Sequence, residues 1–286
     1  MADPYLIEGP ALISFSGGRT SGYMLWKMIE AHGGKLPDDV HVTFANTGKE
    51  REETLRFVYE CGSRWGVPIR WLEWKARKGP IEDRFEEVGF NSASRNGEPF
   101  ADLIAEKKFL PNPVTRYCTI ELKIRTMKFF AQSLGWEHWT NVIGLRADEP
   151  HRVARARVSD KKELWTNALP LADAGVTNRD VRSFWNTQDF DLQLLPFEGN
   201  CDACFLKARP KLWEIERERP STLNWWIEQE NRMDQLAKKG AGQFRKEYTY
   251  TELQAAVQRS PDLFLGAFDD DLEMDAECGT WCGEAA

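Results

Sequence analysis

The feature that most constrains the fold of this chain is a short apolar run that ends in two glycines and leads directly into a helical pattern. Ala11 to Phe15 form the run, and Ser16-Gly17-Gly18-Arg19-Thr20-Ser21 follows it. From Gly22 to Ala31, apolar residues recur at helical spacing. A short apolar run bounded by glycine is typical of a buried strand, and a longer periodic stretch is typical of a helix. The pattern therefore predicts a strand, a tight loop and a helix.

This loop, residues 16–21, has the composition of a phosphate-binding site, and we call it the phosphate loop. Its glycines let the backbone approach an anion closely, and the amides at the helix N-terminus point at that anion with the helix dipole behind them. Ser16, Thr20 and Ser21 offer hydroxyl donors, and Arg19 offers charge. Ligands of open parallel sheets lie outside the carboxyl ends of the strands, where this loop must sit. The alternative is a tight turn that merely contains two glycines.

Further strands and helices alternate along the first 200 residues. Such alternation predicts an α/β fold with a mainly parallel, doubly wound sheet that is covered on both faces. The segment from Lys78 to Asn112 has no clean period, so we expect an insertion over a site or a long surface connection. We expect Asn178 to cap a later helix. The predicted strands are residues 40–45, 69–74 and 141–145, and the predicted helices are 52–65, 121–134 and one from 178.

The pattern divides the chain into two parts. Residues 1–198 are expected to form the nucleotide-binding α/β domain, and residues 199–286 a helical appendage with cysteines and an acidic tail. Helices are expected around residues 207–219 and 221–239.

The composition limits the partners and the location of the protein. A net charge of −7 argues against a protein that coats nucleic acid through its overall field. Arg146 to Lys162 form a basic island, which suits a solvated loop or a local anion site. No stretch approaches the roughly 20 apolar residues of a membrane span, and the N-terminus does not resemble a secretory signal. We therefore expect a cytoplasmic protein without a membrane partner, and the sequence leaves its oligomeric state open.

Six cysteines are present, and two of them form Cys201-Asp202-Ala203-Cys204. In a reducing cytoplasm this spacing favours metal binding or redox chemistry over a structural disulfide. Cys61 falls in the predicted helix after the second strand, where a buried, inert thiol is expected.

Four motifs follow one another along the chain: residues 15–21, residues 44–50 with 53–55, residues 115–119 with Lys123, and residues 144–149 with Arg152. Together they resemble the adenylylsulfate and phosphoadenylylsulfate (PAPS) reductase family of the PP-loop ATP pyrophosphatases. The resemblance covers most of residues 10 to 210. It implies the adenine nucleotide alpha-hydrolase-like fold and an adenine nucleotide as ligand.

By this resemblance a set of residues surrounds the nucleotide, with Lys123 and Arg146 acting on the phosphates or the acidic leaving group as catalytic residues. One departure stands out, because the loop has Thr20 where the family has an Asp. Any metal-binding role of that carboxylate is therefore in question. The implied nucleotide-binding residues are Ser14, Ser16, Gly17, Gly18, Arg19, Thr20, Ser21, Asn46, Thr47, Arg116, Gly144 and Arg152.

The resemblance also implies a [4Fe–4S] cluster, which takes four thiolates. Cluster-bearing members have a Cys-Cys pair and a later Cys-x-x-Cys, whereas this chain has Tyr117-Cys118 at the pair. Cys118, Cys201 and Cys204 would then be joined by Cys278 or Cys282, and we assign Cys282 as the fourth ligand. Zinc is the alternative metal.

The tail Glu277-Cys-Gly-Thr-Trp-Cys282 resembles the family's Glu-Cys-Gly-x-His tail, whose cysteine attacks sulfur. Cys278 is thus the predicted nucleophile, although Trp281 replaces the family's His. The other interpretations are that Cys278 is a cluster ligand, or that it forms a disulfide with Cys282.

Two main functions follow. The first is a reductase that releases sulfite from PAPS or adenylylsulfate with the help of a thiol reductant protein. The second is an ATP- and Mg²⁺-dependent enzyme that adenylates a small molecule or a nucleic-acid base, on which Trp225 and Trp226 could stack. A nucleotide-binding subunit without catalysis is the third.

Overall fold

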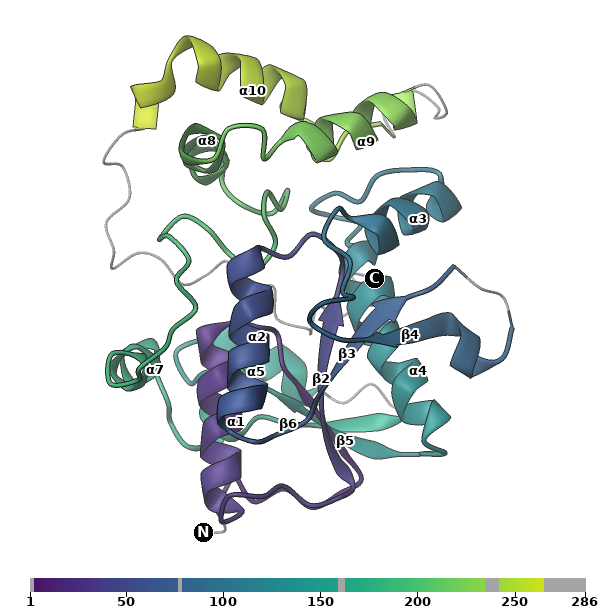
Figure 1. Ribbon diagram of the computed structural model, residues 1–286, viewed down its shortest axis with the longest axis vertical. Coiled ribbons are helices and arrows are strands. Elements are labelled where there is room, and N and C mark those ends of the chain that lie inside the picture. The colour runs from purple at the N-terminus through teal and green to yellow at the C-terminus, as the bar shows by residue number, and fades with distance from the viewer. Residues whose placement is uncertain (1–2, 77–78, 159–162, 235–241, 265–286) are drawn as a thin grey trace.

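A mixed sheet forms the centre of the molecule (Figure 1). The computed structural model describes residues 3–76, 79–158, 163–234 and 242–264. Within them a six-stranded sheet has the order β4-β3-β2-β1-β5-β6, and every pair is parallel except β3 with β4. The predicted mainly parallel sheet is confirmed. The strands are β1 (Ala11–Ser14), β2 (Val40–Asn46), β3 (Ile69–Trp74), β4 (Phe85–Val88), β5 (Trp139–Ile143) and β6 (Trp165–Ala168).

Helices cover both faces of the sheet, as the doubly wound fold requires. They are α1 (Arg19–Ala31), α2 (Glu52–Arg64), α3 (Glu98–Lys107), α4 (Thr126–Ser133), α5 (Pro150–Arg157), α6 (Pro170–Asp173), α7 (Asn178–Trp185), α8 (Arg209–Glu218), α9 (Asn224–Asp234) and α10 (Tyr250–Arg259). Short 3-10 helices span Ile81–Arg84 and Pro261–Phe264, and a π-helix spans Thr119–Arg125. None of the helices in these ranges is long and apolar enough to cross a bilayer.

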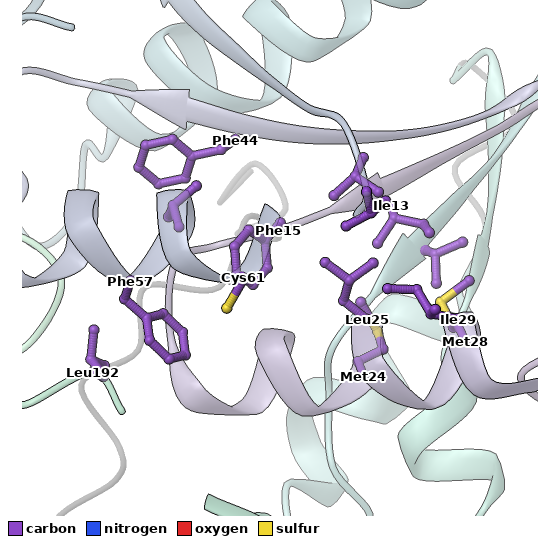
Figure 2. Close-up of a cluster of buried hydrophobic side chains, with 14 of the residues drawn as sticks. Ile13, Phe15, Met24, Leu25, Met28, Ile29, Phe44, Phe57, Cys61 and Leu192 are labelled. Atoms are coloured by element: carbon purple, nitrogen blue, oxygen red, sulfur yellow. The ribbon is translucent and has the colours of Figure 1, made fainter. Parts of the chain in front are cut away.

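Alternate side chains of β1 point to opposite faces, which is the period of a strand. Ile13 and Phe15 lie in the core cluster with α1 and α2, whereas Leu12 lies in the cluster with α4. Figure 2 shows the first cluster, where Phe15 and Cys61 lie among side chains of α1 and α2. Cys61 is fully buried, as expected, and burial raises the pKa of its thiol.

The register of the central strands brings three loops to one edge of the sheet. Ser14 lies opposite Thr43 on one side and Ile143 on the other. The strands β1 and β5 therefore end at the same level, and β2 continues three residues further in the same direction, to Asn46. The phosphate loop, the loop after β2 and the loop after β5 emerge there together.

Helices α8, α9 and α10 lie together at one end of the sheet, at the top of Figure 1. They share an aromatic core in which Trp226 and Tyr250 stack with ring centroids 5.5 Å apart. Because Trp226 is buried there, it is a core residue and not a platform for bases. Phe100 of α3 packs against Trp226 in the same cluster. The division of the chain at residue 198 stays a prediction.

The structure adds detail to one local prediction and corrects two. The segment from Lys78 to Asn112 holds the short antiparallel edge strand β4 and the helix α3, whose first turn contains Pro99. The cap of α7 is Thr177, which forms a capping box with Asp180, and Asn178 is the first helical residue. The basic island is helical over α5.

Candidate nucleotide site

The phosphate loop lies between β1 and α1, as predicted. Gly17 has a φ of +79°, which favours glycine. Gly18 is the N-cap of α1 and has no side chain to cap the first amides, so these remain directed at the loop. The Ser16 and Ser21 hydroxyls lie 2.9 Å apart, and Ser21 Oγ donates to the Gly18 carbonyl. This arrangement of donors can hold an anion.

The side chain of Arg19 is bound by a carboxylate that lies far away in the sequence. Its Nε and Nη2 donate to Asp191 at 2.7 and 2.6 Å, in the two-pronged geometry that guanidinium groups favour. Burial acts to raise the pKa of Asp191, but the hydrogen bonds and charge of Arg19 lower it overall. The indole of Trp185 on α7 donates to the Arg19 carbonyl at 2.8 Å. Asp191 thus binds the side chain of Arg19, and Trp185 binds its backbone carbonyl.

Thr20 contacts an arginine from the loop after β5. Thr20 is fully buried, and its hydroxyl accepts from Arg146 Nη1 at 3.1 Å. Arg146 is itself buried, and its Nε donates to Asp148 at 2.9 Å. Gly144 lies so close to α1 that a Cβ there would be 3.4 Å from the Ser21 Cα. The loop after β5 thus brings a guanidinium to the phosphate loop.

The side chains after β2 are bound within the protein. Asn46 donates to Glu73 at 2.6 Å and to the Ser94 carbonyl at 2.9 Å, and its Oδ1 accepts from the Gly48 amide. The Thr47 amide and hydroxyl both donate to Glu50, each at 2.8 Å. Asn46 and Thr47 therefore fix the shape of this loop, and their predicted contact with the nucleotide stays a prediction.

Glu50 joins a lysine and a cysteine from distant parts of the chain. Its side chain is fully buried, and its Oε1 lies 3.4 Å from Lys123 Nζ. The thiol of Cys201 donates to the same oxygen at 3.9 Å. Lys123 belongs to the π-helix, an element that frequently marks functional sites.

The segment from Asn200 to Cys204, which we call the cysteine segment, packs directly on the phosphate loop. Asn200 Nδ2 donates to the Ser16 carbonyl at 2.8 Å. The backbone at Cys201 forms an antiparallel bridge with Glu50. Arg51 N donates to the Asn200 carbonyl at 2.7 Å, and Asp202 N donates to the Lys49 carbonyl at 2.9 Å. The segment therefore pairs like an extra strand with the loop after β2.

Charged side chains hold the cysteine segment from the other side. Lys49 forms an ion pair with Asp202 at 2.7 Å, and Trp226 Nε1 donates to the second oxygen of that carboxylate at 2.9 Å. Lys207 is buried, which lowers its pKa, while the nearby Cys204 and Cys201 act in the opposite direction. The side chain of Lys207 thus lies beside both cysteines of the segment.

The comparison with known families agrees with this geometry. The model of the phosphoadenosine phosphosulfate reductase domain matches residues 10–205. The chain belongs to this family. The match ends just after the cysteine segment, so it includes the phosphate loop, the loops after β2 and β5 and the cysteine segment, whereas Lys207 and Trp226 lie beyond it.

Two relatives of this reductase-family chain share part of its length. The uncharacterised nin region protein ORF290 of Escherichia phage lambda is 31% identical over 206 residues, which are 70% of this chain and 67% of the phage protein. The uncharacterised protein MJ0066 of Methanocaldococcus jannaschii is 26% identical over 170 residues. These residues are 58% of this chain and 29% of the archaeal protein.

The fit to an iron–sulfur cluster is incomplete in this family member. In the described ranges, no three His, Cys, Asp or Glu side chains form a group that could hold a metal ion, and Cys118, Cys201 and Cys204 are no exception. Tyr117, at the position of the missing cysteine, is buried and donates its hydroxyl to a backbone carbonyl, so it serves the core. Cys278 and Cys282 lie outside the described residues.

The remaining predicted residues lie at the rim or inside the sheet. Arg152 on α5 forms an ion pair with Glu149, and Arg116 is half-buried just before the π-helix. Ser14 is turned inward, where its hydroxyl donates to Asn141 at 2.9 Å. Their contact with a nucleotide stays a prediction.

Sequence reasoning missed Glu50, Asn200 and Asp148. Each lies inside or next to a motif that the sequence analysis identified, and this position in the sequence was the only signal of its role. Their partners lie elsewhere in the sequence, and only the fold brings them together.

Proposed function

We propose that this protein is an enzyme that binds an adenine nucleotide on the phosphate loop and performs thiol chemistry on it, as a sulfonucleotide reductase. The observation that carries the proposal is the hydrogen bond from Asn200 to the Ser16 carbonyl. It ties a pair of cysteines to the anion site.

The binding step needs donors and positive charge around the phosphate groups. The amides at the start of α1, the hydroxyls of Ser16 and Ser21, and the guanidinium of Arg146 meet at one edge of the sheet. Lys123 of the π-helix lies beside Glu50, which belongs to the loop after β2. These groups would stabilise the nucleotide as its charge rises on leaving.

The chemical step requires two thiols. A cysteine thiolate attacks the sulfonate sulfur, an S–S bond forms, and the bond from sulfur to the nucleotide phosphate breaks. A second thiol then attacks the cysteine sulfur and releases sulfite, and the two thiols are left as a disulfide. A thiol reductant protein would restore them. We assign the first attack to Cys278 on the resemblance of the tail.

A [4Fe–4S] cluster or a zinc ion stays a prediction. Cys118, Cys201 and Cys204 would need a fourth ligand, Cys282 or Cys278, from the tail. We derive no step through such a group.

A second candidate function is an ATP pyrophosphatase that transfers adenylate to a nucleic-acid base or a small molecule. Helix α5 favours it, because His151, Arg155 and Arg157 are exposed on a helix that follows the Arg146 loop directly. Exposed basic residues beside a nucleotide site suit a polyanionic acceptor.

Product analysis separates these functions. Anaerobically purified protein with a dithiol reductant receives PAPS, adenylylsulfate or ATP·Mg²⁺ in separate reactions. Sulfite from either sulfonucleotide, lost in Cys278→Ser and kept in Cys61→Ala, is the expected result. AMP and pyrophosphate from ATP, with both sulfonucleotides intact, would instead establish the pyrophosphatase. Nucleotide binding without any product would indicate a non-catalytic subunit.

A further inference from the structure

Asp148 links the phosphate loop to helix α7. Its Oδ1 accepts from Arg146 Nε at 2.9 Å, and its Oδ2 accepts from the Asn178 amide at 2.8 Å. The Asp148 side chain is 35% exposed to solvent, whereas the Arg146 side chain is 5% exposed. The partly exposed carboxylate of Asp148 thus forms a hydrogen-bonded ion pair with the buried guanidinium of Arg146.

The hydrogen bonds of Arg146 within the protein leave its Nη2 available to a ligand. Arg146 uses Nε for Asp148 and Nη1 for Thr20, and its amide donates to Glu149 at 3.0 Å. Its Nη2 makes no hydrogen bond to any part of the chain that the structure describes. A guanidinium is planar, so two fixed nitrogens also fix the third.

We propose that Asp148 is a positioning residue, which acts through Arg146 to orient the guanidinium toward the phosphates or sulfonate of the bound nucleotide. The inference rests on the nucleotide site of the proposed function, but not on its thiol chemistry. Without Asp148, Arg146 would keep its charge and lose its direction. Charged hydrogen bonds depend strongly on geometry, so affinity for the anionic part of the ligand would fall.

A competing role for Asp148 is to stabilise the start of α7. That helix also touches the loop at its other end, where Trp185 donates to the Arg19 carbonyl. Asp180 provides the matched control, because it accepts from the Thr177 amide at 2.8 Å and the Thr177 hydroxyl at 2.6 Å. It caps the same helix, and its hydrogen bonds do not involve Arg146.

Calorimetry with adenosine 3′,5′-bisphosphate and with adenosine tests the proposal without turnover. Asp148→Ala should weaken the bisphosphate about tenfold, which corresponds to about 1.4 kcal/mol, and leave adenosine unchanged. Arg146→Met should also weaken the bisphosphate, and Asp148→Ala should add nothing in that background. Asp180→Ala should lower the melting temperature without changing either affinity.

Three results would overturn the positioning role. They are an equal loss for adenosine and bisphosphate, a full further loss in the Arg146→Met background, and an affinity loss in Asp180→Ala that matches Asp148→Ala. Wild-type protein that binds neither ligand would overturn the nucleotide site as well. Binding with the expected cycle but without sulfite release would overturn the reductase alone.

Discussion

Replacing Gly17 by alanine should destabilise the protein by about 2–4 kcal/mol. Gly17 has a φ of +79°, where alanine costs about 1 kcal/mol relative to glycine. A Cβ there would lie 2.7 Å from Thr54 Cγ2 and 3.1 Å from both Phe44 Cε2 and Val58 Cγ2. Overpacking of this kind costs about 1–3 kcal/mol more, because the buried neighbours must shift.

Gly135 supplies the control for this measurement. It has the same φ of +79°, but a Cβ on it would meet nothing within 4 Å. Urea unfolding followed by tryptophan fluorescence gives the free energy of unfolding for Gly17→Ala, Gly135→Ala and wild type. The difference between the variants isolates the contacts with Thr54, Phe44 and Val58. Equal losses in the two variants would refute the packing argument.

Three further predictions concern side chains away from the loop. Burial raises the pKa of Glu230 to about 7, against the amides of Tyr250 and Phe244. The stability that the protonated Glu230 contributes is then fully present below about pH 4.5 and is lost as the pH rises through 7. The free energy of unfolding of Glu230→Gln should therefore rise relative to wild type by up to about 3 kcal/mol between pH 4.5 and 8 in urea unfolding. A difference that does not change with pH would contradict this. Native protein should protect Cys61 from iodoacetamide, as peptide mass spectrometry would show, because its thiol is buried and its pKa is raised; labelling at the rate of unfolded protein would contradict this. A [4Fe–4S] cluster held by Cys118, Cys201, Cys204 and a tail cysteine requires about four irons per chain in anaerobically purified protein, and Cys201→Ser should lose them; stoichiometric zinc without iron would refute the cluster.

The strands that the sequence predicted are those with apolar runs. Residues 69–74 form β3 as predicted, because Ile69, Trp71, Leu72 and Trp74 give it a mostly apolar, aromatic-rich pattern despite its two charged residues. β4 was missed because its two central residues are glutamates, which suit the edge of a sheet. The helix α5 was missed because its arginines face solvent and leave few apolar residues to show a period.

The motifs identified the phosphate loop, but not the contacts that shape it. Thr20 and Arg146 are 126 positions apart, and Glu50 and Cys201 are 151 apart. No local pattern records such pairs, because strand order and register bring them together. Arg19 shows the same limit: the sequence offers its charge to a phosphate, but the fold pairs it with Asp191.

The contacts of the phosphate loop have a consequence for the order of events during synthesis. Ser16 is held by Asn200, which is 184 residues later in the chain, and Arg19 is held by Trp185 and Asp191. A nascent chain that has already made β1 and α1 therefore still lacks the groups that hold the loop. We expect the ability to bind nucleotide to be acquired only after residue 200 has left the ribosome. Nucleotide in the cell would then favour the completed chain over any shorter intermediate.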